Sequence, residues 1–182
     1  MSLLRCATAV QNPRNRFELH CPREPGFLCA VSKLRLFVKY WLPILLWFTL
    51  IFGASSDASS VQHSSRLIGP LVRWLFPHLA EASVGHIVYF VRKCAHLTEY
   101  AILALLFWRA FRKPVKADTR PWSWIESRNA WLGVVVYAST DEIHQRFVPG
   151  RQGSFYDVLI DSTGGALGLL ALWAFGRWRK LW

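Results

Sequence analysis

The chain has 182 residues, of which 53% are hydrophobic and 10 are tryptophan, and its formal net charge is +11. This length allows one domain, with or without a tail. A basic chain this apolar indicates a membrane protein rather than a nucleic-acid-binding protein, because nucleic-acid binding needs a contiguous basic face on a folded domain. The four cysteines show no CxxC spacing, so they indicate neither a zinc site nor a disulfide framework.

The N-terminal segment has no apolar run long enough for the core of a signal peptide. It contains three prolines and scattered arginines, so we expect residues 1–35 to form a poorly ordered cytoplasmic tail. A transmembrane domain is expected over residues 36–180. A spanning helix needs about 20 mostly apolar residues, and the segment that meets this requirement most cleanly is Leu36–Ala54.

The segment after this first predicted span has two parts. Residues 54–65 are rich in serine and are expected to be irregular. Apolar residues then recur at i, i+3 and i+4 spacing from Leu67 to Leu79. This spacing predicts a short amphipathic helix, which either lies on the outer membrane surface or packs on the end of the helix bundle.

Three further spans are predicted at Ile87–Trp108, Asn129–Gln145 and Asp157–Phe175. They contain polar residues, so their assignment also depends on the charge pattern of the connecting segments. In the last span, Gly164 and Gly168 form a GxxxG motif, which favours close helix packing. The predicted fold class is all-α, a polytopic membrane helix bundle of four transmembrane helices with a short amphipathic outer helix.

Lysine and arginine are distributed unevenly between the connecting segments. Seven lie within residues 1–40, six within residues 109–128 and three at the C-terminus, but only Arg66 and Arg73 lie within residues 55–86. By the positive-inside rule, both termini are cytoplasmic. The start of the second span, the end of the third and the start of the fourth therefore meet in the outer leaflet.

Ionisable residues gather at these three helix ends. Helical spacing places residues 92, 96 and 99 on one face of the second span, residues 141 and 144 together on the third, and residues 157 and 161 together on the fourth. Charges at membrane depth are costly, so we expect them to face the bundle interior and to pair. The predicted polar site consists of Arg92, Lys93, His96, Glu99, Asp141, Glu142, His144, Gln145, Arg151, Asp157 and Asp161.

These motifs resemble those of VanZ-like membrane proteins. The matching stretches are Arg92-Lys93-x-Ala95-His96-x-x-Glu99-Tyr100, Asp141-Glu142-x-His144-Gln145-x-Phe147-x-Pro149-Gly150-Arg151, Asp157-Val158-x-x-Asp161-x-x-Gly164 and Phe52-x-x-Ser55-Ser56. The resemblance covers about residues 40–175. It implies a multi-pass protein of the bacterial plasma membrane, in a family named for resistance to the glycopeptide antibiotic teicoplanin. It does not imply a settled biochemical activity.

Three interpretations of the polar site remain open. The first, which we favour, is binding of an envelope-related amphiphile (a lipid head group, a cell-wall precursor or a lipoglycopeptide), with Arg92 and Arg151 holding phosphate or carboxylate. The second is a membrane-embedded metal-assisted or acid–base enzyme on a lipid-linked substrate. Its metal ligands would be His96, Glu99, Asp141 and His144. The third is a purely structural network. The favoured interpretation needs no cofactor and no nucleic acid, and it leaves the oligomeric state open.

Overall fold

A computed structural model describes residues 10–11, 17–18, 26–56, 60–114, 118, 120–148 and 153–182 of the chain. The chain divides into two compact units, Met1–Lys39 and Tyr40–Trp182. The first unit contains a pair of antiparallel two-residue strands, β1 (Val10–Gln11) and β2 (Phe17–Glu18), and nearly all of helix α1 (Gly26–Tyr40). Because α1 begins at residue 26, the segment that we expected to be poorly ordered contains a helix.

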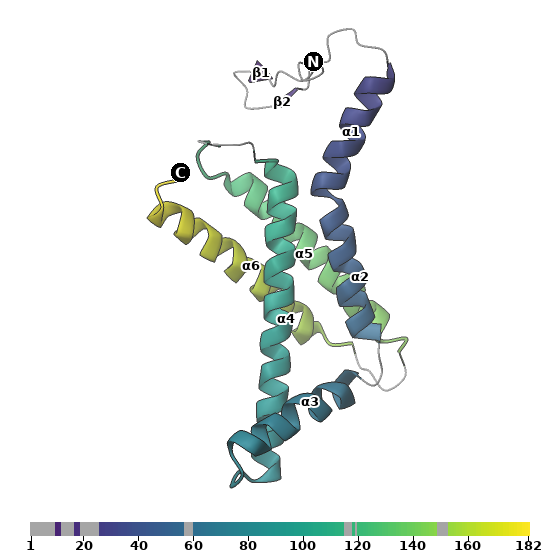
Figure 1. Ribbon diagram of the computed structural model, residues 1–182, viewed down its shortest axis with the longest axis vertical. Helices are drawn as coiled ribbons and strands as arrows, with labels where there is room; N and C mark the ends of the chain where they lie inside the picture. Colours follow the sequence, from purple (N-terminus) through teal and green to yellow (C-terminus); the bar gives the residue numbers. More distant parts are fainter. Residues whose placement is uncertain are drawn as a thin grey trace, which may run out of the picture. The chain divides into compact units, whose positions relative to one another are not determined.

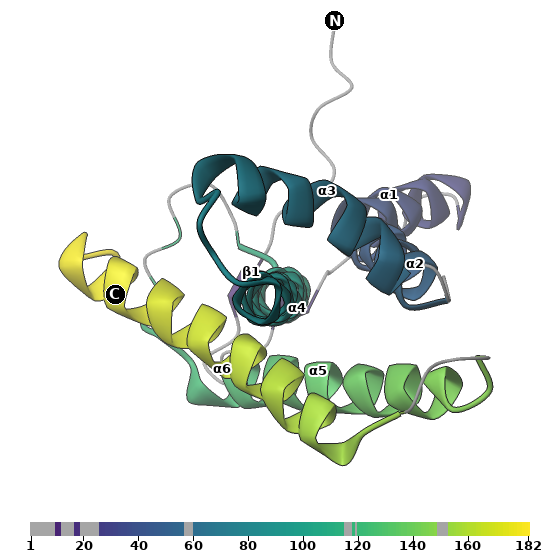
Figure 2. The ribbon, with the colours of Figure 1, turned by 90° about the horizontal axis from the view of Figure 1, so that it is seen from below.

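The second unit is helical throughout its described elements. These are α2 (Leu42–Ser56), α3 (Ser60–Leu75), α4 (Glu81–Arg112), α5 (Trp124–Gln145) and α6 (Phe155–Trp178) (Figure 1). The central helix is α4, which packs most extensively against α6 and also contacts α2, α3 and α5. Figure 2 shows α4 end-on with these four helices around it. The predicted all-α class is confirmed.

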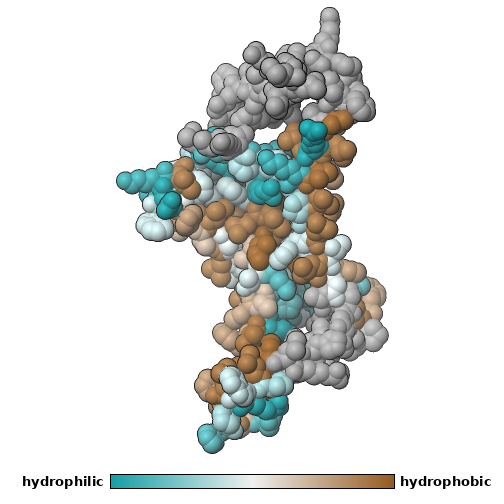
Figure 3. Space-filling view, viewed as in Figure 1, coloured by the Kyte–Doolittle hydropathy of each residue, from teal (hydrophilic) through white to brown (hydrophobic). Residues whose placement is uncertain are grey.

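Two helical segments are long and apolar enough to cross a membrane, Lys33–Gly53 and Phe155–Trp178. They match the first and fourth predicted spans. The other two lie within α4 and α5, whose polar residues lower their hydropathy, so the number of four spans remains a prediction. Large apolar side chains are exposed on the bundle, including Leu46 of α2 and Val136 of α5. In Figure 3, hydrophobic residues cover much of the middle of the bundle, whereas the C-terminal end of α6 is hydrophilic.

Local sequence explains several helix ends. Pro43 lies in the first turn of α2, where its missing N–H is not needed for helical hydrogen bonding. Helix α4 stops at Lys113, which adopts a left-handed conformation (φ 46°) directly before Pro114. Ser123 caps α5 and Ser154 caps α6, each accepting a hydrogen bond from a backbone N–H in the following turn.

The GxxxG motif packs α6 closely against α4, as predicted. A Cβ atom on Gly164 would lie 2.9 Å from the Cα atom of Leu97, and one on Gly168 would lie 2.9 Å from the Cβ atom of Ala101. Real Cβ atoms essentially never approach other atoms this closely, so the two helices are as near as they are because both positions lack a side chain.

The predicted amphipathic helix is confirmed as α3, although it begins at residue 60, within the stretch that we expected to be irregular. One edge of its apolar face packs on the start of α4, where Val72 meets Val84 and Val88. The other edge is open, since Leu71 is 54% and Trp74 77% exposed. The helix therefore packs on the bundle and also presents apolar side chains outward.

Candidate functional site

An ion pair joins α4 to α6 at the polar site. The Nζ atom of Lys93 contacts the Oδ1 atom of Asp157, and both side chains are partly buried. The two residues are 64 positions apart in the sequence. This contact brings together the polar starts of the second and fourth predicted spans, as the argument from helix direction required.

The end of α5 contributes a buried hydrogen-bonded group. Gln145 Nε2 donates to Asp141 Oδ2 at 3.0 Å and to Glu142 Oε1 at 3.2 Å. From α4, the hydroxyl of Tyr100 donates to Asp141 Oδ2 at 3.4 Å. The backbone N–H of Ser154, at the start of α6, donates to Glu142 Oε2 at 2.7 Å. The two α5 carboxylates are thus tied to both neighbouring helices.

Asp161 lies one turn further along α6 than Asp157 and is only 3% exposed. It is within electrostatic reach of Asp141, Glu142 and Lys93. Within the described part of the chain, no hydrogen bond reaches its carboxylate. With Asp161, the described residues of the polar site contain more carboxylates than lysine and arginine side chains.

One face of α4 carries three further ionisable groups, Arg92, His96 and Glu99. His96 Nδ1 lies 3.6 Å from Glu99 Oε2, and the indole N–H of Trp47 in α2 donates to the backbone carbonyl of Glu99 at 2.9 Å. Arg92, one turn before His96, has a buried Nε atom with no hydrogen-bond partner among the described residues, and its guanidinium carbon lies 6.0 Å from the ring centre of Tyr89. In the described site, Arg92 is thus a cation without a neutralising carboxylate.

The two remaining predicted site residues are His144 and Arg151. The His144 ring lies on α5 with its centre 4.4 Å from that of Phe52 in α2. Arg151 lies outside the described residues. Helix α2 is therefore a fourth helix at the polar site, beside α4, α5 and α6, since it contacts the site both at Glu99 and at His144. Tyr100, Ser154 and Trp47 also contact it, although we did not predict them as site residues.

The donor set of the metal-enzyme interpretation is not assembled in the described part of the chain. No three or more His, Cys, Asp or Glu side chains there are arranged to hold a metal ion. His96 and Glu99 lie against each other on α4, whereas Asp141 is held by Tyr100 and Gln145.

The profile of the VanZ/LLP1 family matches residues 40–176. The chain belongs to the VanZ/LLP1 family. The resemblance inferred from the four matching stretches is thereby confirmed, and the match contains every predicted residue of the polar site. No curated protein and no solved structure matches the chain.

A second ionic cluster of the VanZ/LLP1 domain lies at the opposite end of α4. Arg112 is 3% exposed, and its guanidinium lies 3.2 Å from Asp118 and 3.3 Å from Glu126, with the ring centre of Trp108 at 5.4 Å. Arg120 pairs with Asp118 at 2.7 Å and donates to the backbone carbonyl of Arg112 at 2.9 Å. The hydrogen bond from Arg120 lowers the pKa of Asp118 to about 2.

We did not predict this second cluster from the sequence. We interpreted the arginines of residues 109–128 only as markers of the cytoplasmic side. The signal that was present is the pair of acids, Asp118 and Glu126, in an otherwise basic segment. Arg112 and Arg120 thus hold the connecting segment to the bundle as well as contributing to the charge asymmetry.

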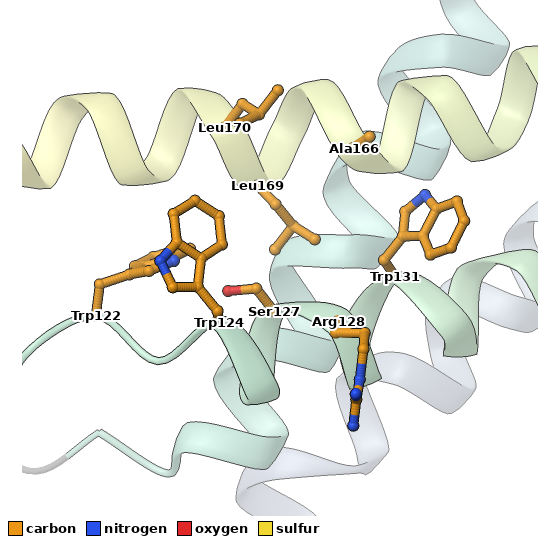
Figure 4. Close-up of a pocket in the computed structure, with 8 residues that line it drawn as sticks. All are labelled: Trp122, Trp124, Ser127, Arg128, Trp131, Ala166, Leu169 and Leu170. Carbon is orange, nitrogen blue, oxygen red and sulfur yellow. The ribbon is translucent and has the colours of Figure 1, made fainter.

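Next to this cluster, α5, α6 and the preceding Trp122 line an open cavity of about 270 Å³. Figure 4 shows Trp122 and Trp124 at one end of it, Trp131 at the other and Leu169 pointing in from α6, while Arg128 points away. Tryptophan is enriched where membrane proteins meet the membrane–water interface. In the VanZ/LLP1 domain, these tryptophans lie near the basic end of the bundle.

Proposed function

We propose that this VanZ/LLP1 protein spans the plasma membrane four times, with both termini in the cytoplasm, and binds the anionic head group of an envelope-related amphiphile at its polar site. The chemical group recognised is a phosphate or a carboxylate, as found on phospholipids, lipid-linked cell-wall precursors and lipoglycopeptides. The observation that carries the proposal is the partly buried Arg92, which has no acidic partner in the described site.

The membrane part of the proposal is supported by three features that agree. Two helical segments have the length and hydropathy of spans, the bundle exposes large apolar side chains, and lysine and arginine are concentrated in alternate connecting segments. The tryptophans around the 270 Å³ cavity lie at the basic end, where an interfacial belt is expected.

The state of the neighbouring cations makes Arg92 distinctive. Lys93 is committed to Asp157, and His96 faces Glu99. A purely structural network would be expected to neutralise Arg92 as well, because a charge at membrane depth without a partner costs several kcal/mol. An anionic ligand supplies the partner that the Arg92 guanidinium does not find among the described carboxylates.

Arginine is also well suited to this ligand class. Its planar guanidinium donates parallel hydrogen bonds to two oxygens of one phosphate or carboxylate. The buried Nε atom of Arg92 is one such donor, and its position over the Tyr89 ring limits how the guanidinium plane can turn. The ion pair of Lys93 with Asp157 keeps a second positive charge beside it without competing for the same carboxylate.

The direct test is native mass spectrometry of the full chain with phosphatidylglycerol as an anionic probe and phosphatidylcholine as a zwitterionic one. Wild-type protein is expected to retain phosphatidylglycerol preferentially. Arg92→Ala should weaken that binding about tenfold or more, as expected for the loss of charge-assisted hydrogen bonds. Arg92→Lys keeps the positive charge but cannot donate two parallel hydrogen bonds, so its affinity for phosphatidylglycerol should be intermediate.

Arg179→Ala is the matched control, because Arg179 is an exposed arginine beyond the end of α6. Equal binding of the anionic probe by wild type, Arg92→Ala and Arg179→Ala would contradict the proposal and favour the structural interpretation. Teicoplanin, added as a competitor in the same measurement, tests whether a lipoglycopeptide uses the same site.

A further inference from the structure

A groove of about 360 Å³ lies between α2, α4 and α5. Its walls are Phe48 of α2, Phe107 of α4 and five residues of α5 between Leu132 and Thr140. Val136, in the middle of the α5 wall, is 64% exposed, so the groove opens at the surface of the bundle. The volume is within the usual range of ligand pockets, and the lining is almost entirely apolar.

On α4, the groove lies further along the same helix face as the polar site. Residues 92, 96, 99, 103 and 107 follow at i, i+4, i+7, i+11 and i+15, which places them on one helix face. The first three are Arg92, His96 and Glu99, the fourth is the fully buried Leu103, and the fifth is Phe107 in the groove wall. A single face of α4 thus changes from charged to apolar toward the groove.

The other two walls run the same way. On α5, the groove ends at Thr140, next to Asp141 and one turn before His144. On α2, Phe48 lines the groove, and Phe52, one turn further, packs against His144 with ring centres 4.4 Å apart. All three helices therefore place the end of the groove beside the polar site, and the α5 wall extends about 12 Å away from it.

From the shared face of α4 and the position of Thr140 next to Asp141, we infer that the groove is the subsite for one hydrocarbon chain of the amphiphile whose anionic head group lies at Arg92. The inference rests on the proposed function. A bilayer offers lipid chains an environment as apolar as the groove, so the groove alone has little to hold a chain. A head group fixed at Arg92 tethers its own chain beside the groove, and the raised effective concentration then favours that chain.

Gly133 gives the groove its depth. A Cβ atom at this position would meet the Phe107 ring at 3.1 Å, so any larger residue would occupy the space between α5 and α4. The mouth is formed by the exposed side chain of Val136, where a larger residue can fill the groove without displacing packed atoms.

The test compares two probes with the same head group, dipalmitoyl phosphatidylglycerol and dibutyryl phosphatidylglycerol, whose chains are too short to follow the groove. Wild-type protein in nanodiscs or detergent should bind the long-chain probe about tenfold more tightly. Val136→Trp should remove this preference and leave binding of the short-chain probe unchanged. Leu132→Trp, which fills the same wall, should act in the same way if Val136→Trp folds poorly.

Leu167→Trp is the matched control, because Leu167 is a similarly exposed apolar residue on α6 that does not line the groove. It should keep the long-chain preference. If both groove variants keep the long-chain preference, the inference is wrong. Weaker binding of both probes to Arg92→Ala would in that case still support the proposed function. Unchanged binding of both probes to Arg92→Ala would contradict both the inference and the proposed function. A lipid-free dimer that Val136→Trp abolishes would show that a second copy of the chain, rather than a lipid, occupies the groove.

Discussion

Asp118 is the residue through which acid should act on the end of the bundle that holds the Arg112 cluster. Its pKa in the folded protein is about 2, below the usual 3.8, because Arg120 donates hydrogen bonds to its carboxylate. A lowered folded-state pKa contributes stability that is complete above the unfolded-state value and is lost as the pH falls from about 4 to about 2. Thermal unfolding of the detergent-solubilised protein should show this loss.

Asp118→Asn should lower the free energy of unfolding near neutral pH by about 1–3 kcal/mol and flatten its dependence on pH in that acid range. Glu81→Gln is the control. Arg73 also lowers the pKa of Glu81, at a hydrogen-bond distance of 2.8 Å, but that pair is exposed, and exposed ion pairs contribute little to stability. An unaltered acid profile in Asp118→Asn would show that the Arg112 cluster does not hold the connecting segment.

Single residues of the polar site were predictable where they share a helix face with another ionisable residue. Helical spacing reveals that Arg92, His96 and Glu99 lie on one face of α4. It does not reveal partners on other helices, so the hydroxyl of Tyr100 and the backbone N–H of Ser154 appeared only in the structure. Backbone donors carry no sequence signal at all.

At the scale of helices, Gly164 sets the distance between α4 and α6. Gly164→Ala would place a Cβ atom 2.9 Å from the Cα atom of Leu97, and backbone atoms cannot rotate away as a side chain can. We expect a loss of about 1–3 kcal/mol in the free energy of unfolding, as for other overpacked contacts. Thermal or chemical unfolding in detergent measures it.

Gly85→Ala provides a matched comparison on α4, because nothing lies within 4 Å of a Cβ atom at that position. There the substitution should stabilise the helix by about 0.5–1 kcal/mol. Equal effects of the two substitutions would mean that the contact between α4 and α6 is not close.

Helix existence was better predicted from sequence than helix extent. Apolar stretches, the charge pattern and, for α3, apolar periodicity located the described helices of the second unit. However, α4 begins at residue 81 and α5 at residue 124, five or more residues before the predicted spans. These extensions lie outside the apolar windows and depend on local features such as the Ser123 cap. A hydropathy window measures the apolar composition of a segment and does not detect such caps.

At the scale of the whole molecule, the charge asymmetry makes a prediction about sidedness. In a background without the four native cysteines, His78→Cys would report the segment between α3 and α4, and Arg179→Cys would report the C-terminal end. A membrane-impermeant thiol reagent should label His78→Cys in intact cells and Arg179→Cys only after lysis, because the basic segments stay in the cytoplasm. Labelling of Arg179→Cys in intact cells would contradict the proposed topology and the outward position of the polar site.

The molecular arrangement was only partly accessible from the sequence. Opposed helix directions predicted which helix ends meet, and the contact of Lys93 with Asp157 agrees with that prediction. The central position of α4 was not predicted, because it depends on contacts between helices, such as those of Gly164 and Gly168 in α6 and Gly133 in α5 with side chains and backbone of α4. Amino-acid composition alone does not show which helix of a bundle has the most neighbours.

The ion pair between α4 and α6 also constrains how the chain is made. When α4 leaves the ribosome, Lys93 has no counter-charge, because Asp157 is synthesised 64 residues later. At typical translation speeds this delay is roughly 3–13 s. A helix with unpaired charges partitions poorly into lipid, so α4 should remain at the insertion machinery until α6 arrives, and the two helices should enter the bilayer together.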